Sequence, residues 1–178
     1  MAPSDGDNLL QSVGAIFDHV AHAVPSIRDL LPLYRDILGG EVAGGGFNDC
    51  GGHLGVHFTF PGGGRVELLE PIQPDSSSVG RFLERNPRGG LHHLTFKVSD
   101  LRAALEVVTG GYETFGTRVD EPSWQETYLH PRSTGGVLIQ LVQSYPGLPP
   151  AFDRPLEEIL DEADSRRGQA GLAVIASA

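Results

Sequence analysis

The sequence predicts an α+β fold in which two tandem βαβββ modules form one curved, mostly antiparallel mixed sheet. The first observation is an internal repeat, because the stretch H-V-A-H-A-V beginning at His19 can be laid over H-L-T-F-K-V beginning at His93. The second is that a helix-like segment follows each stretch, at 26–38 and at 100–109. The period of this repeat is well above that of solenoid units, which indicates duplication of a small module rather than a solenoid array.

The third observation is that an apolar strand carrying one polar side chain closes each half. Glu67 stands within V-E-L-L and Gln140 within L-I-Q-L. Glu67 follows His19 by 48 residues, and Gln140 follows His93 by 47 residues. The two halves therefore repeat one plan, with a histidine on the first strand and an acid or amide on the last.

Composition and charge narrow the class of protein. The chain has 178 residues, 39% of them hydrophobic and 20% charged, which is enough for a domain with a real core. The net charge of −10 argues against a nucleic-acid or membrane partner. We expect no membrane span and no signal peptide. Cys50 is the single cysteine, so no internal disulfide can form and a cytoplasmic location is expected.

Changes of composition divide the chain. The first residues are polar and glycine-bearing, and a proline-rich stretch follows Ser144. The last segment is expected to pack on the body or on a partner subunit. The prediction is a flexible leader at 1–14, a domain at 15–144 with a first module (15–71), a linker helix region (72–88) and a second module (89–144), and a C-terminal linker with a short helix at 145–178.

Hydrophobic periodicity predicts the elements of the first module. Alternation favours a strand at 16–24, and apolar residues at helical spacing favour a helix that Gly39-Gly40 ends. A short strand at Glu41 and Val42 is expected to precede a mobile glycine-rich loop at 44–52. The helix positions are Ile27, Leu30, Leu31, Tyr34, Ile37 and Leu38, and the later elements are strands at 53–60 and 65–69, a turn at 61–64 and a helix at 79–86.

The second module follows the same plan. Gly89-Gly90 leads into a strand at 91–98, and Ser99-Asp100 caps a helix that Gly110-Gly111 ends. An amphipathic helix is expected after the linker, at 155–167, with an apolar tail from Gly168. The apolar helix positions are Leu101, Ala104, Leu105 and Val108, then Leu156, Ile159, Leu160 and Ala163, and the strands are 114–119, 126–130 and 137–142 around a turn at 131–136.

The repeated polar residues predict a metal site. If the modules pack about a pseudo-twofold axis, His19, Glu67, His93 and Gln140 converge inside the curved sheet. Two imidazoles, a carboxylate and an amide oxygen suit a divalent ion such as Zn, Co, Mn, Ni or Fe. A metal held in this way can stabilise an enolate.

Other interpretations exist for these residues. An inward histidine is often satisfied within a core, and Gln140 can hydrogen-bond within the sheet alone. The repeat favours metal binding, and a buried Glu67 is costly unless it binds a metal or forms an ion pair. His22 and His92 are expected on the opposite faces of their strands, where we predict structural roles.

Four motifs carry a family resemblance. They are D-H-V-A-x-A-V-P (18–25), V-E-L-L-E-P (66–71), the stretch V-G-R-F-L-E-R-N-x-x-G-G-L-H-H-L (79–94), and L-H-P-x-S-x-G-G-V-L-I-Q-L (129–141). Together they resemble the vicinal oxygen chelate superfamily, which includes glyoxalases, bleomycin-resistance proteins and dioxygenases. Within it, the chain is most similar to the methylmalonyl-CoA epimerase family.

The resemblance implies metal ligands at His19, Glu67, His93 and the position of Gln140. It also implies a homodimer and a small-molecule substrate such as an acyl-CoA. Family members usually have glutamate at the last position, where it binds the metal and moves the substrate proton. Gln140 cannot act as a base.

The catalytic residues we predict are His57 and Glu126, together with Gln140 at the position of the family's glutamate. Tyr128 is a further titratable group nearby. His57 is the nearest substitute for an acid that the epimerases carry on the third strand. Its orientation depends on the hairpin. A two-residue turn at 62–63 places Phe58 opposite Glu67, whereas a three-residue turn places Thr59 there and His57 on the same face. The sequence leaves both registers open.

The resulting function is a metal-dependent isomerase or epimerase that transfers a proton next to a carbonyl. The substrate stays open between methylmalonyl-CoA and another small carbonyl or hydroxy-ketone compound. A glyoxalase I-type lyase, an iron dioxygenase and a non-catalytic binding or resistance protein are the alternatives. Gln140 counts against the dioxygenase, and the intact ligand set counts against the binding protein.

Overall fold

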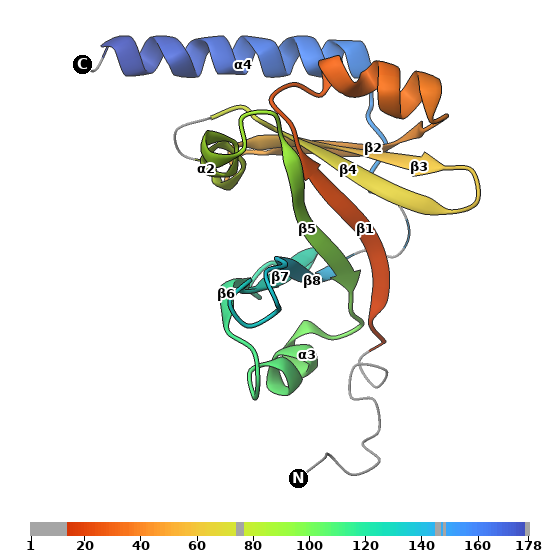
Figure 1. Ribbon diagram of the computed structural model, residues 1–178, viewed down its shortest axis with the longest axis vertical. Coiled ribbons are helices and arrows are strands. Elements are labelled where there is room, and N and C mark those ends of the chain that lie inside the picture. The colour runs from red at the N-terminus through yellow and green to blue at the C-terminus, as the bar shows by residue number, and fades with distance from the viewer. Residues whose placement is uncertain (1–13, 74–76, 145–146, 148, 177–178) are drawn as a thin grey trace. The chain divides into compact units, whose positions relative to one another are not determined.

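A computed structural model describes residues 14–73, 77–144, 147 and 149–176 (Figure 1). Eight strands are hydrogen-bonded in the order β2-β3-β4-β1-β5-β8-β7-β6, which confirms the predicted α+β fold with one mixed sheet. Almost all of the predicted leader lies outside the described residues. The chain forms two compact units, one of Met1–Val20 with His93–Gly147 and the other of Ala21–His92 with Leu148–Ala178.

The first unit contains the closing strands of the second half. Within it β5 pairs in parallel with β8, and β8 pairs antiparallel with β7, which pairs antiparallel with β6. The apolar face of α3 packs on Leu129 and Leu141 in a buried cluster. The elements are β1 (Ile16–Ala23, continuing into the second unit), β5 (Gly90–Lys97, beginning there), α3 (Leu101–Val108), β6 (Thr114–Arg118), β7 (Trp124–Leu129) and β8 (Ile139–Ser144).

The second unit contains an antiparallel hairpin, β3–β4, with β2 paired to β3. One face of these strands packs against the C-terminal helix, α4, in the largest buried cluster (Figure 1). The elements are η1 (Arg28–Leu30), η2 (Pro32–Ile37), β2 (Glu41–Asn48), β3 (His53–Phe60), β4 (Gly64–Pro71), α2 (Ser78–Arg85) and α4 (Leu156–Ala176).

The predicted helix at 26–38 is wrong in type. A 3-10 turn, η1, is followed by a π-helical segment, η2, which Pro32 begins. Proline has no N–H to donate, so a continuous α-helical ladder cannot pass through this position. Ile27 and Leu31 are buried as predicted, but Ile37 is 76% exposed and does not belong to the core.

The predicted loop at 44–52 is also wrong in part, because β2 extends to Asn48. The strand has an irregular register between Val42 and Gly44, which is the mark of a β-bulge. Gly44 and Gly45 have φ values of 134° and 148°, and a Cβ on Gly44 would lie 2.1 Å from the carbonyl oxygen of Pro150. Only glycine fits here, so the run that predicts a loop is a strand in close contact with the C-terminal linker.

The C-terminal helix is longer than predicted, since α4 continues beyond Arg167 to Ala176. Its four predicted apolar positions, Leu156, Ile159, Leu160 and Ala163, are all buried. They pack with residues of β3 and β4, so α4 is part of the core of its unit. None of the helices in the described part of the chain has the length and apolar character needed to cross a membrane.

The closing strand of each half also holds the start of the helical segment of that half. Oε2 of Glu70 accepts a hydrogen bond from the backbone N–H of Ile27 at 2.5 Å. Oε1 of Gln143 accepts one from the N–H of Leu101 at 2.8 Å. The buried Glu70 carboxylate is also paired with Arg167 of α4, with 2.8 Å between Nη1 and Oε1. The two halves thus share one hydrogen bond from the start of the helical segment to the closing strand. The acceptor is an acid in the first half and an amide in the second.

Candidate metal centre

Two predicted ligands, His19 and His93, come together in the first unit. Both side chains are buried, and their ring centroids lie 6.0 Å apart. A ligand nitrogen of one lies within 4.8 Å of a ligand nitrogen of the other. Two nitrogens bound to one ion at about 2.1 Å each are at most about 4.2 Å apart, so a small rotation would suffice for both to bind it.

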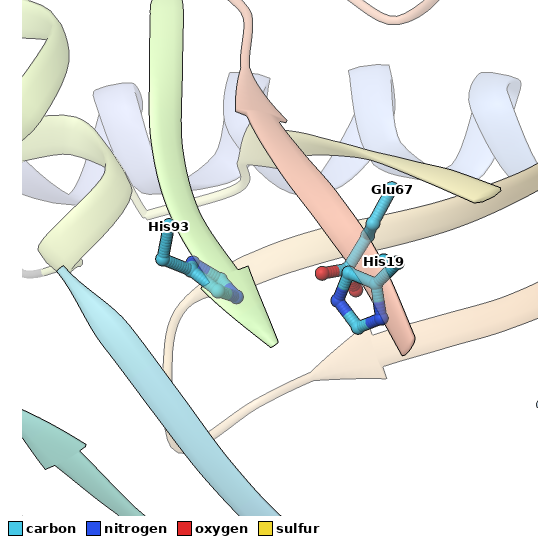
Figure 2. A group of neighbouring side chains, drawn as sticks. All are labelled: His19, Glu67 and His93. Carbon is cyan, nitrogen blue, oxygen red and sulfur yellow. The ribbon is translucent and has the colours of Figure 1, made fainter. Parts of the chain in front are cut away.

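Figure 2 shows these side chains on their strands, with His19 on β1, His93 on β5 and the predicted third ligand, Glu67, on β4. Asp18 fixes the proton of His19, because Nδ1 of the ring lies 2.6 Å from Oδ2 of the carboxylate. A carboxylate accepts but cannot donate, so Nδ1 carries a hydrogen that it donates to Asp18. A carboxylate behind a histidine in this way is common at metal sites.

A buried hydrogen-bond network connects His19 with Gln140. Nε2 of His19 lies 3.0 Å from Oγ1 of Thr95, and this hydroxyl donates to Oε1 of Gln140 at 2.8 Å. Thr95 and Gln140 are paired in the parallel register of β5 and β8, so the sheet itself places them side by side. The amide group of Gln140 then donates from Nε2 to Oε2 of Glu126 at 2.7 Å and to the hydroxyl of Tyr128 at 3.0 Å.

The Glu126 carboxylate is the centre of this network. It is 6% exposed, and Nε of Arg118 donates to Oε1 at 3.0 Å. Nε1 of Trp124 and the hydroxyl of Tyr128 donate to Oε2 at 3.1 and 3.2 Å. Both oxygens of this buried carboxylate therefore have hydrogen-bond donors, as a buried polar group requires.

The other predicted residues, His57 and Glu67, face one another in the second unit. They are directly opposed in the β3–β4 register, and Nε2 of His57 lies 3.2 Å from Oε1 of Glu67. Both predicted registers are therefore wrong, although His57 does share the face of Glu67. The loop is 61–63, with Phe60 opposite Gly64.

The glycine-rich turn explains why the sequence left the register open. Gly62 and Gly63 both have positive φ values, of 86° and 98°, and the N–H of Gly63 donates to the carbonyl of Phe60. Several turns are open to three successive glycines, so the turn sequence does not select one.

Gly55 provides the space that the Glu67 carboxylate occupies. A Cβ on Gly55 would lie 2.6 Å from Oε1 of Glu67, closer than side-chain atoms normally approach. Gly55 precedes His57 by two residues on β3, so both lie on the same face of the strand. The side chain of Glu67 thus lies across Gly55 and beside His57.

His22 and His92, which were predicted to have structural roles, make contacts of their own. Nδ1 of His22 hydrogen-bonds to the hydroxyl of Tyr34 at 2.8 Å, and burial lowers the pKa of His22. His92 packs edge-on against Phe82, and burial lowers the pKa of His92 to about 4, so this ring is neutral at pH 7.

Sequence reasoning did not identify Asp18, Thr95, Arg118 or Trp124 as parts of the network. Thr95 had a detectable signal, since it follows His93 by two residues on one strand and must share its face. Asp18 stands within the first family motif. Arg118 had no local signal, because its contact with Glu126 depends on the irregular pairing of β6 with β7.

The sequence matches the Glyoxalase/Bleomycin resistance protein/Dioxygenase superfamily over residues 18–128, and the chain belongs to this superfamily. Among its relatives, the ethylmalonyl-CoA/methylmalonyl-CoA epimerase of Cereibacter sphaeroides is 32% identical over 130 residues, which cover 71% of this chain and 96% of the relative.

Solved structures agree with this placement. The methylmalonyl-CoA epimerase of Mycobacterium tuberculosis superposes with a TM-score of 0.65 at 29% identity, covering 73% of this chain and 88% of that one. A variant of the Streptomyces coelicolor enzyme in complex with 2-nitronate-propionyl-CoA gives a TM-score of 0.61 at 29% identity, covering 72% and 96% of the two chains.

Proposed function

We propose that this chain is a metal-dependent epimerase that moves a proton next to the thioester carbonyl of a CoA ester, with a substituted malonyl-CoA as the substrate class. The relatives named as epimerases support the reaction and the ligand class. The observation that carries the proposal is the buried network that connects His19, through Thr95, with Gln140.

We propose His19, His93, Glu67 and Oε1 of Gln140 as the ligands of one divalent ion such as Zn, Co, Mn, Ni or Fe, because these residues hold equivalent places in the two halves of the repeat. The chemistry of the donor set fits such an ion, because it offers two imidazole nitrogens with a carboxylate and an amide oxygen. Because Nδ1 of His19 is bonded to Asp18, Nε2 is the ring nitrogen that would bind the ion, in place of its contact with Thr95. When bound, the ion would supply Lewis-acid stabilisation of the negative charge that develops on the substrate oxygen.

The chain must supply the proton acceptor from another residue than Gln140. We propose His57, because an imidazole can accept a proton and this ring lies beside Glu67, with 3.2 Å between Nε2 and Oε1. Glu126 was the other predicted acid, but donors from Arg118, Trp124, Tyr128 and Gln140 occupy both of its oxygens. We therefore propose that Glu126 positions its neighbours and leaves proton transfer to His57.

The direct test is incubation of the metal-loaded protein with methylmalonyl-CoA and ethylmalonyl-CoA in D2O. Mass spectrometry should show deuterium at the carbon between the two carbonyl groups at a rate well above that without protein. Absence of exchange with every divalent ion listed above would contradict the proposed reaction.

A second test addresses the ligands. Elemental analysis should find about one divalent ion per chain, and His93→Ala should lose it with only a modest change in fold. His92→Gln is the matched control, because His92 is the neighbour on β5 whose ring packs on Phe82. Retention of a full equivalent of metal by His93→Ala would refute the ligand assignment.

A further inference from the structure

We infer that Glu126 is a positioning residue for Gln140, and that the acid at 126 is the reason why an amide rather than a glutamate stands at 140. The inference deepens the proposed function and rests on it where metal binding is concerned. It is carried by the 2.7 Å contact from Nε2 of Gln140 to Oε2 of Glu126, between two side chains that are 5% and 6% exposed.

The contact determines which chemical groups can coexist. Glutamate at 140 would replace the donating NH2 by an oxygen at the same place, so two carboxylates would meet at hydrogen-bond distance in a buried site. Like charges at this separation repel strongly where water is excluded, and such a pair holds only one negative charge. An amide at 140 instead donates to the acid and requires no shared proton.

The contact also determines which atom Gln140 offers to a ligand. Because a carboxylate only accepts, the NH2 group must point to Glu126 and the carbonyl oxygen must point the other way. On that side Oε1 accepts from the hydroxyl of Thr95, which in turn contacts Nε2 of His19. Glu126 therefore keeps the amide oxygen, a metal-binding atom, directed toward the side chain of His19, a predicted ligand.

The equivalent place in the first half supports this interpretation. Tyr128 is directly opposite Gln140 and His57 is directly opposite Glu67, so Glu126 and Gly55 occupy equivalent positions two residues earlier. In the first half the closing strand carries the acid, Glu67, and the adjacent strand has Gly55, whose missing Cβ leaves room for the carboxylate. In the second half the adjacent strand carries the acid, Glu126, and the closing strand has an amide, Gln140. Each pair of positions thus holds one carboxylate.

A double-mutant cycle tests the coupling with Glu126→Gln, Gln140→Glu and the two changes together. The readouts are the melting temperature without metal and the affinity and visible absorption spectrum with Co²⁺. We expect Gln140→Glu to lower Tm by about 5 °C or more. Glu126→Gln should weaken Co²⁺ binding by about tenfold, since the amide can then turn its nitrogen to the metal.

The double variant should regain Tm to within about 2 °C and Co²⁺ affinity to within about threefold of the unchanged protein. It exchanges acid and amide between the same two positions, so it keeps one carboxylate. Additive effects in both readouts would overturn the inference. If Gln140→Glu does not fold, unchanged Co²⁺ affinity and spectrum of Glu126→Gln would overturn it.

The outcomes separate this inference from the proposed function. If the unchanged protein binds no metal but the effects on Tm are coupled, the metal site fails and the acid–amide pairing stands. If the protein binds metal and epimerises its substrate while the cycle is additive, the pairing fails by itself. Thr95→Val is a useful companion variant, because it removes the hydroxyl on the Oε1 side and leaves the Glu126 contact in place.

Discussion

The closing strands β4 and β8 occupy equivalent places in the two halves but differ in charge. Glu67 and Glu70 on β4 correspond to Gln140 and Gln143 on β8. The pattern of contacts is conserved, since Glu70 and Gln143 each accept the N–H at the start of the helical segment of their half. The backbone geometry of the repeat is therefore kept while an acid and an amide are exchanged within it.

The difference shows that the charge of each polar side chain is matched by its neighbour. Glu67 lies beside His57 and over Gly55, and Glu70 is paired with Arg167. On β8 the amides need no cation, and Glu126, the buried acid that contacts Gln140, is paired with Arg118. A buried carboxylate persists only where a cation or several donors surround it, which is why acids and their partners occur together.

The largest effect on stability is expected at Glu70, the buried acid of β4 that corresponds to Gln143 on β8. Arg167→Met removes the cation beside the buried Glu70 and should lower the free energy of unfolding by about 3 kcal/mol. Urea unfolding measures it. Arg166→Met is the control on the same helix, since Arg166 pairs with the carboxylates of Asp49 and Glu162, neither of them buried, and lies over the ring of Phe47, and it should cost about 1 kcal/mol.

The same variant has a defined pH dependence. Burial raises the pKa of Glu70, so this group stabilises the fold in its protonated form and the contribution is lost as pH rises through the raised pKa. Without Arg167 the pKa should rise further. The loss in free energy of unfolding caused by Arg167→Met should thus be largest at neutral pH and smaller in acid. Adding Glu70→Gln to this variant should reduce the loss. A deficit independent of pH would contradict the pairing.

The next largest effect concerns Gly55. Gly55→Ala places a Cβ 2.6 Å from Oε1 of Glu67, and the flexible carboxylate must move away. We expect metal affinity to fall by about tenfold, with less than about 1 kcal/mol lost in the free energy of unfolding. Calorimetric titration with Co²⁺ measures the affinity.

Gly46→Ala is the control for this prediction, because Gly46 faces Gly55 across β2 and β3 and a Cβ there meets nothing within 4 Å. Equal losses of metal affinity in both variants would show that the strand, rather than the position of Glu67, is disturbed.

A smaller effect is expected at Tyr128, the counterpart of His57. Its hydroxyl donates to Glu126 and accepts from Gln140. Tyr128→Phe keeps the ring and should cost about 1 kcal/mol in the free energy of unfolding. Epimerisation should continue, since we assign proton transfer to His57. Loss of deuterium exchange in Tyr128→Phe, with metal still bound, would instead identify Tyr128 as the proton-transfer group.

The smallest effect is expected at Arg118. Its side chain is 48% exposed, so solvent screens its pair with Glu126. Arg118→Met should cost less than about 1 kcal/mol at low salt and still less at 1 M NaCl. A loss as large as that of Arg167→Met would show that the two acids depend equally on their arginines, which would remove the contrast between the halves.

Prediction succeeded where the signal was local or repeated. The strands at 53–60 and 91–98 and the helix after Asp100 lie close to their predicted bounds, because alternation and capping act over a few residues. The superfamily is confirmed, and the epimerase relatives agree with the predicted activity. Homodimer formation, the cytoplasmic location, the domain boundaries and the site roles stay predictions.

Prediction failed where long-range packing overrides local preference. Gly44 and Gly45 form part of a strand because the C-terminal linker approaches their backbone, and this contact joins residues about 100 positions apart. The register of the β3–β4 hairpin was not predicted for a related reason. A turn of three glycines accepts several geometries, and the pairing of His57 with Glu67 belongs to the whole sheet.

By itself the sequence determined the duplicated plan, the two histidines and the acid or amide that closes each half, because these features repeat at fixed spacing along the chain. Only the tertiary structure decided what stands beside them. Glu126 lies beside Gln140 and Gly55 beneath Glu67 because strand pairing joins residues that are distant in sequence, and pairing sets which groups share a buried space. In that space a carboxylate needs a donor, so the neighbour determines whether an acid or an amide can stand at the end of each half.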